Sequence, residues 1–124
     1  MKFYQILMAN NILNGVSLNS LNIEDAKCIL DFRRKVAPHI SAFEQARKDA
    51  AEKLQPTFTD DMTADMRKAL EEEWNAKVLE ALTDELNREI DIEVKKTSPD
   101  AEALILVNNK VAMGELDVLR FLLG

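Results

Sequence analysis

The chain has 124 residues, of which 47% are hydrophobic and 31% are charged, and its net charge at pH 7 is −6. This length and balance predict one folded domain over residues 1–124, large enough to bury a core without metal or disulfide support. The single cysteine, Cys28, excludes an internal disulfide and a cysteine-built zinc site. No run approaches the roughly 18 apolar residues of a membrane span, so we expect a cytoplasmic protein without membrane contact.

The acidic charge is concentrated in the middle of the chain. Residues 60–102 hold fourteen Asp or Glu and six Lys or Arg, a net charge of −8, whereas residues 1–59 carry +2. Binding to a phosphate backbone depends on clustered Lys and Arg, so this distribution argues against direct nucleic-acid binding. It leaves basic protein surfaces open as partners.

The first half of the chain has two predicted helices. Apolar residues over 3–13 recur at helical spacing and predict a short helix, while residues 16–22 alternate as a short strand or an extended linker would. Asn22 is a plausible N-cap for a long helix that runs to Leu54. Because Pro38 lies inside it, we expect a kink or a break near Ala37.

A second long helix is predicted after a loop over residues 55–59. Thr59 or Asp60 is its expected cap, and Arg67–Glu71 and Glu73–Lys77 are its expected surface ion pairs. Its expected buried side has apolar residues four apart: Met62, Met66, Leu70, Trp74, Val78, Leu82 and Leu86. Two long helices joined by a short loop predict an antiparallel helical hairpin with coiled-coil character.

The pattern changes after Glu89. Apolar and charged residues alternate over 90–95, which indicates a strand, and the apolar run 103–107 is a plausible returning strand after a turn at 97–100. Met113 or Gly114 opens a short C-terminal helix. The predicted fold is therefore mainly α: a short N-terminal helix, a long hairpin, a two-stranded β element near residues 90–107 and a short C-terminal helix.

These residues provide little basis for catalytic chemistry. His39 is the only histidine and has no second ligand at metal-binding spacing, and Cys28 is interpreted as a small hydrophobe on the long helix. The basic cluster 33–35 is typical of a solvated helix face, and so is the acidic run 71–73. We therefore predict no cofactor, no metal and no enzymatic activity. A carboxylate-built metal hydrolase is the only enzyme that the sequence permits.

The candidate interaction residues lie in the second long helix. Trp74, the sole tryptophan, either anchors the hairpin core or serves as an exposed interface anchor, since tryptophan is enriched at binding hot spots. The acidic residues around it would form the rest of the contact surface. The full predicted set is Trp74, Glu71, Glu72, Glu73, Asp84 and Glu85.

Three stretches resemble a family of small, functionally uncharacterised bacteriophage and prophage proteins. They are the leading helix at 4–13, the charged helix end at 43–54, and the segment 85–96, where a helix end runs into an acidic alternating strand. The resemblance covers most of the chain but consists of charge and apolarity patterns. It implies a phage or prophage product that acts through protein contacts, and it assigns no residue a role.

Two interaction functions follow, together with the remote enzyme. The first is a phage-encoded interaction protein, in virion assembly or as an accessory factor, with self-association into a homo-oligomer as its simplest form. The second is a small acidic inhibitor of a host protein, in the manner of an anti-defence protein, which binds a basic surface. The first would act in the host cytoplasm or the virion, and the second in the host cytoplasm.

Overall fold

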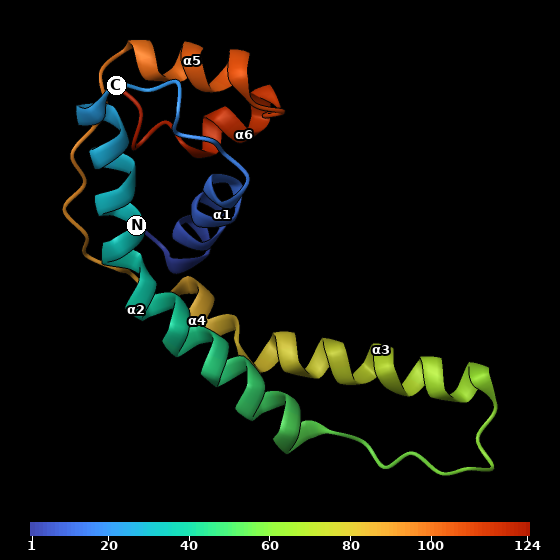
Figure 1. Cartoon of the computed structure of the whole chain (residues 1–124). Helices are drawn as coiled ribbons and strands as arrows, with labels where there is room; N and C mark the ends of the chain where they lie inside the picture. Colours follow the sequence, from blue (N-terminus) through green and yellow to red (C-terminus); the bar gives the residue numbers. More distant parts are fainter. The chain divides into compact units, whose positions relative to one another are not determined.

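The computed structural model describes all residues, 1–124, and is mainly helical, as predicted: 66% of the chain lies in six helices, and no strand forms. The helices are labelled in Figure 1. In chain order they are α1 (Phe3–Asn14), α2 (Ile23–Leu54), α3 (Ala64–Ala81), α4 (Thr83–Asn87), α5 (Asp100–Asn108) and α6 (Met113–Val118).

The chain divides into two compact units. The first combines Met1–Pro38 with Glu89–Gly124, and the second is His39–Arg88. The boundary falls inside α2, directly after Pro38. Unfolding as the single domain that the length indicates stays a prediction.

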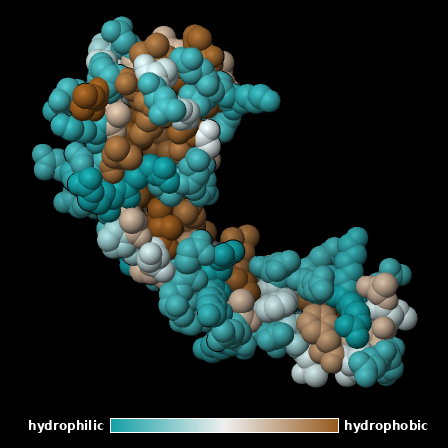
Figure 2. All heavy atoms as spheres, in the orientation of Figure 1, coloured by the Kyte–Doolittle hydropathy of each residue, from teal (hydrophilic) through white to brown (hydrophobic).

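The first unit contains most of the buried apolar side chains. One face of α1 is buried, and α1 lies beside α6 (Figure 1). The Phe32 ring of α2 meets Phe121 edge to face, with ring centroids 5.3 Å apart. Figure 2 shows apolar side chains, in brown, gathered over this unit with polar ones around them. The largest fully buried side chains here are Phe3, Ile6, Leu13, Ile29, Val36, Ile105, Leu116, Leu119 and Leu122.

Helix α2 begins where the sequence predicts. The side-chain oxygen of Asn22 accepts a hydrogen bond from the Asp25 amide at 2.8 Å, which satisfies one of the free amides of the first turn. Residues on both sides of Pro38 remain helical, so the expected break near Ala37 does not occur. The proline still removes one amide from the helix, and it does so at the boundary between the units.

In the second unit, the C-terminal part of α2 and helix α3 run in opposite directions (Figure 1). The expected cap of α3 at Thr59 or Asp60 is wrong. Thr63 is the cap, because its hydroxyl oxygen accepts from the Met66 amide at 3.2 Å. The helix also ends earlier than expected, at Ala81, and Leu82 separates it from the short α4.

The predicted β element near residues 90–107 is wrong. Residues 91–99 are extended, and Ile90 and Thr97 are buried while the charged residues between them are exposed, as the alternation indicates. However, this segment lies along α2 and has no strand partner: the Lys35 ammonium donates to the Glu93 carbonyl at 2.8 Å. An isolated antiparallel bridge joins Lys2 to Glu89.

The expected returning strand is instead helix α5. Asp100 and Glu102 lie in its first turn, where acidic groups favour a helix, and Ala101 and Ile105 are buried one turn apart. The linker at residues 16–22 contains a turn rather than a strand. Helix α6 begins at Met113, one of the two positions expected.

Candidate functional site

The apolar stripe of α3 is only partly covered by the rest of the second unit. Its residues recur every four positions, and yet α3 contains no buried residue. Met66 is 52% exposed, and Leu70, Trp74 and Val78 are half-buried. The prediction that this stripe forms a buried side is therefore wrong for α3, and only Leu82, just beyond the helix, is buried. The stripe combines a packing face with a surface.

Trp74 takes an intermediate position between the two roles proposed for it. Its indole Nε1–H donates to the carbonyl of Ala51 in α2 at 3.0 Å, so its polar edge is fixed across the helix pair. Its ring also lines a shallow hollow of about 190 Å³. The hollow is lined by Leu54, Pro56, Leu70, Glu73, Trp74 and Lys77.

The other predicted interaction residues surround no common point. Glu71, Glu72 and Asp84 are exposed, and Glu73 pairs with Lys77 of the same helix at 3.0 Å. Glu85 pairs with Arg88 at 3.3 Å. These carboxylates form a solvated acidic face, and their role in binding stays a prediction.

Arg67 does not form the expected pair with Glu71. Its guanidinium donates to the Thr59 carbonyl at 2.9 Å and lies over the Phe58 ring, 5.9 Å from the centroid. Both contacts fix the loop before α3 rather than the surface of the helix.

The basic cluster at residues 33–35 is used in contacts within the first unit. Arg33 donates to the side-chain oxygens of Asn10 and Asn14 in α1, and Arg34 pairs with Asp31 at 3.3 Å. Lys35 holds the Glu93 carbonyl. Since each side chain already has a partner, the cluster offers no free basic patch.

The chemically reactive residue types are dispersed. The buried Cys28 thiol donates to the Lys96 carbonyl at 3.7 Å, which agrees with its expected role as a small packed side chain. His39 is half-buried, and no group of three or more His, Cys, Asp or Glu side chains comes together to hold a metal ion.

The one buried carboxylate, Asp25, fastens a loop. It is 3% exposed and accepts hydrogen bonds from the Ser98 amide at 2.7 Å and the Ser98 hydroxyl at 2.6 Å. The Ser98 amide, and then its hydroxyl, lowers the pKa of Asp25; Asn22 adds to this, while burial opposes it. No histidine adjoins the Asp–Ser pair, so it lacks the base that activates a serine nucleophile.

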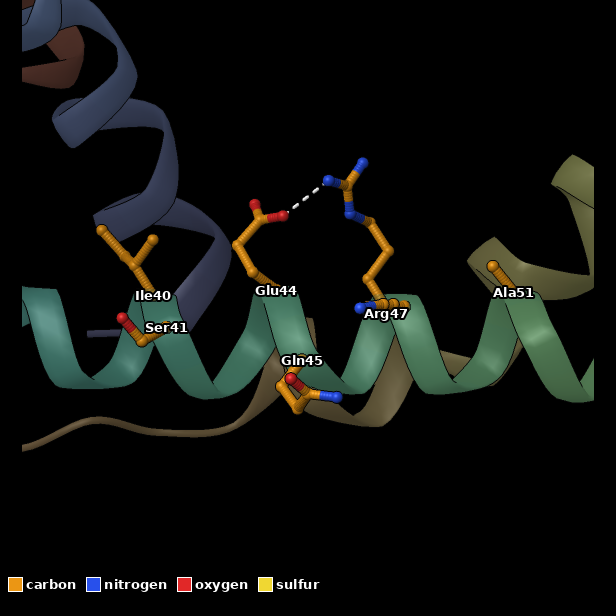
Figure 3. A pocket seen from close by; sticks show the side chains of 7 residues that line it. Ile40, Ser41, Glu44, Gln45, Arg47 and Ala51 are labelled. Carbon is orange, nitrogen blue, oxygen red and sulfur yellow. Dashed lines mark hydrogen bonds and ion pairs between the residues drawn. The ribbon is translucent and has the colours of Figure 1, made fainter.

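A larger hollow, of about 620 Å³, lies along α2 in the second unit (Figure 3). Its lining residues all come from this one helix, and Figure 3 shows the Glu44 and Arg47 side chains reaching toward each other over it. This ion pair is exposed on both sides. An open helix face with a solvated ion pair supplies no enclosed binding site.

A second exposed apolar stripe lies on α1, and the sequence analysis missed it. Tyr4 and Met8 are 40% and 48% exposed, and Ile12 continues their spacing of four residues. Two hollows of about 450 and 480 Å³ between α1 and α6 share Met8 and Val118 in their lining. The detectable signal was the absence of charge, since residues 3–23 contain no Asp, Glu, Lys or Arg.

Comparisons with protein-family models, with curated proteins and with solved structures returned no match. None of the helices has both the length and the apolar character needed to cross a membrane. Function is therefore inferred from the surfaces described above.

Proposed function

We propose that this chain is a non-enzymatic protein-interaction protein, encoded by a phage or prophage, which binds its partner through α3 during virion assembly or as an accessory factor. The observation that carries the interaction role is the incomplete burial of α3. The phage context is supported only by the family resemblance of the sequence patterns.

Apolar surface left in water is the physical basis of the interaction role. A helix on the surface of a stable protein normally buries its apolar stripe, and an exposed stripe indicates a partner. Met66 is 52% exposed, and Leu70 and Trp74 remain half-covered beside it. A partner that covered these three residues would gain roughly 25 cal/mol for each Å² of apolar surface removed from water.

The α3 stripe can be tested by a matched pair of substitutions. Met66→Glu places a charge on the stripe, whereas Leu79→Glu makes the same change on the same helix at a position outside the four-residue register. Both side chains are exposed, at 52% and 60%, so neither variant should unfold the protein. We expect affinity capture from the organism that carries the gene to recover a partner with the wild type and Leu79→Glu but not with Met66→Glu.

Equal recovery by the two variants would contradict binding through the stripe. Recovery of no specific partner by the wild type, at concentrations where it is folded, would contradict the interaction role itself. Circular dichroism of both variants provides the folding control.

The charge of the second unit supports a second candidate, an acidic inhibitor of a basic host protein. Residues 39–88 hold twelve Asp or Glu and seven Lys or Arg, which gives this unit −5 of the total charge of −6. Attraction between an acidic face and a basic surface is screened by salt, whereas apolar contact is not. A partner whose affinity falls steeply between low and high salt favours the inhibitor, and a salt-insensitive one favours the apolar stripe.

A further inference from the structure

We infer that the partner of the α1–α6 face is a second copy of this chain, with the two α1 helices packed antiparallel about a two-fold axis near Met8. This inference deepens the proposed function and rests on it: it names self-association as one of the protein contacts and assigns that contact to a surface separate from α3.

The apolar residues of α1 lie on two opposite sides. Phe3, Ile6 and Leu13 face the core and are at most 1% exposed. Tyr4 and Met8 lie about 100–200° around the helix from these residues and are 40% and 48% exposed. A helix that is apolar on both sides is normally buried on both, so the outer stripe lacks its cover.

The composition of this surface is that of an interface. Residues 3–23 contain no charged side chain in a chain where 31% of residues are charged. The cores of protein interfaces are depleted in charge and enriched in tyrosine and methionine, the residue types of Tyr4 and Met8. The neighbouring end of α6 adds Met113, which is 62% exposed.

The groove beside the stripe has the length of one helix. One hollow is lined by Tyr4, Met8 and Val118, and the next continues from Met8 and Val118 to Ile12. The stripe thus extends over most of α1, which as a helix of 12 residues is about 18 Å long. An antiparallel second α1 would place Tyr4 of one copy against Ile12 of the other and bring the two Met8 side chains together.

Electrostatics favour a second copy at this face over pairing elsewhere. The acidic residues on the rim are already compensated: Glu115 accepts the Ala112 amide at 2.9 Å, and Asp117 pairs with Arg120 at 2.8 Å. Two uncharged stripes can therefore meet without bringing like charges together. Pairing through residues 39–88 would instead oppose two surfaces of charge −5.

The test is the molar mass in solution, by light scattering coupled to size exclusion, of the full chain and three variants. The wild type should approach twice 14.1 kDa as its concentration is raised into the range of roughly 100 μM. Met8→Glu should weaken the dimer at least tenfold, because it opposes two carboxylates at the axis. Leu30→Glu, at a side chain of the same unit that is 47% exposed, should leave the dimer intact.

Met66→Glu separates this inference from the proposed function. If it leaves the dimer intact while abolishing partner capture, the two surfaces are independent, as inferred. A wild type that stays monomeric throughout, or a dimer broken by Met66→Glu but not by Met8→Glu, overturns the inference. Neither result affects partner capture through α3, which is measured separately.

Discussion

The carboxylate of Asp25 connects the first turn of α2 to a loop 73 residues further along the chain. It accepts both the amide and the hydroxyl of Ser98 and is nearly inaccessible to water. The sequence places Asp25 in the first helical turn, where its charge favours the helix dipole. The distant partner could not be predicted, because nothing in the local pattern indicates which loop meets the helix.

Replacing Asp25 should destabilise the fold. Asp25→Asn keeps the size of the side chain but supplies fewer acceptors to Ser98, so a buried donor loses its partner, at a cost of about 1–3 kcal/mol. Asp31→Asn, on an exposed position of the same helix, should change the free energy of unfolding by less than about 0.5 kcal/mol. Urea denaturation of both variants measures the difference, and equal losses would contradict a structural role for Asp25.

The same residue predicts a pH dependence. The pKa of Asp25 in the folded protein lies below its ordinary value of 3.8, so folding favours the charged form. Its contribution to stability is therefore complete above the ordinary value and is lost as the pH falls through the folded value. The gap in unfolding free energy between wild type and Asp25→Asn should shrink when urea denaturation is moved from pH 7 to pH 3.

At the scale of elements, helices were predictable where apolar periodicity is clear. The ranges 3–13 and 22–54 nearly match α1 and α2. The run 103–107 failed because continuous apolar residues fit a strand and a buried helix equally well, and the acidic residues at the start of α5 were assigned to a turn. The alternation over 90–95 correctly indicated extended backbone, but a pattern within one segment cannot show whether a strand or a helix lies beside it.

Pro38 allows a direct test of helix energetics. It is exposed and leaves the carbonyl of Arg34 without an amide donor, so Pro38→Ala should restore one helical hydrogen bond. Alanine is favoured in a helix interior by about 3 kcal/mol, and the greater freedom of the unfolded chain offsets about 0.4–1 kcal/mol of this. We expect a gain of at least 1 kcal/mol, within the usual range for such changes.

Thermal unfolding measures this gain, and Ala37→Gly, one position earlier, should lower stability in the same assay by about 1 kcal/mol. A loss of stability in Pro38→Ala would show that the proline is favoured by the geometry of α2 at the boundary between the units.

At the scale of the whole molecule, the two units are unequally packed. The first unit holds every side chain of the fully buried set, whereas the second buries only Phe43 and Leu82, at 9% and 5% exposure. A single domain can contain parts of unequal stability, and those with few buried contacts open first. Sequence periodicity could not show this, because the α3 stripe predicts a buried face whether or not another helix covers it.

Trp74 reports on this difference, since it is the only tryptophan and lies in the second unit. We expect its fluorescence to change at a lower urea concentration than the far-ultraviolet circular dichroism, which reports on all six helices. Coincident transitions would instead show that both units unfold together. A partner that covers α3 should move the fluorescence transition toward the other.

The extended segment beside α2 separates two properties that usually occur together. Ile92 and Val94 are half-buried, so their side chains are held in place, and yet the amides of residues 91–96 donate to no protein group. Deuterium should therefore enter these amides at nearly the rate of a free peptide, while the side chains stay packed. A deuterium-exchange map would show a fast-exchanging stretch between the protected α4 and α5, although this stretch has a fixed place in the fold.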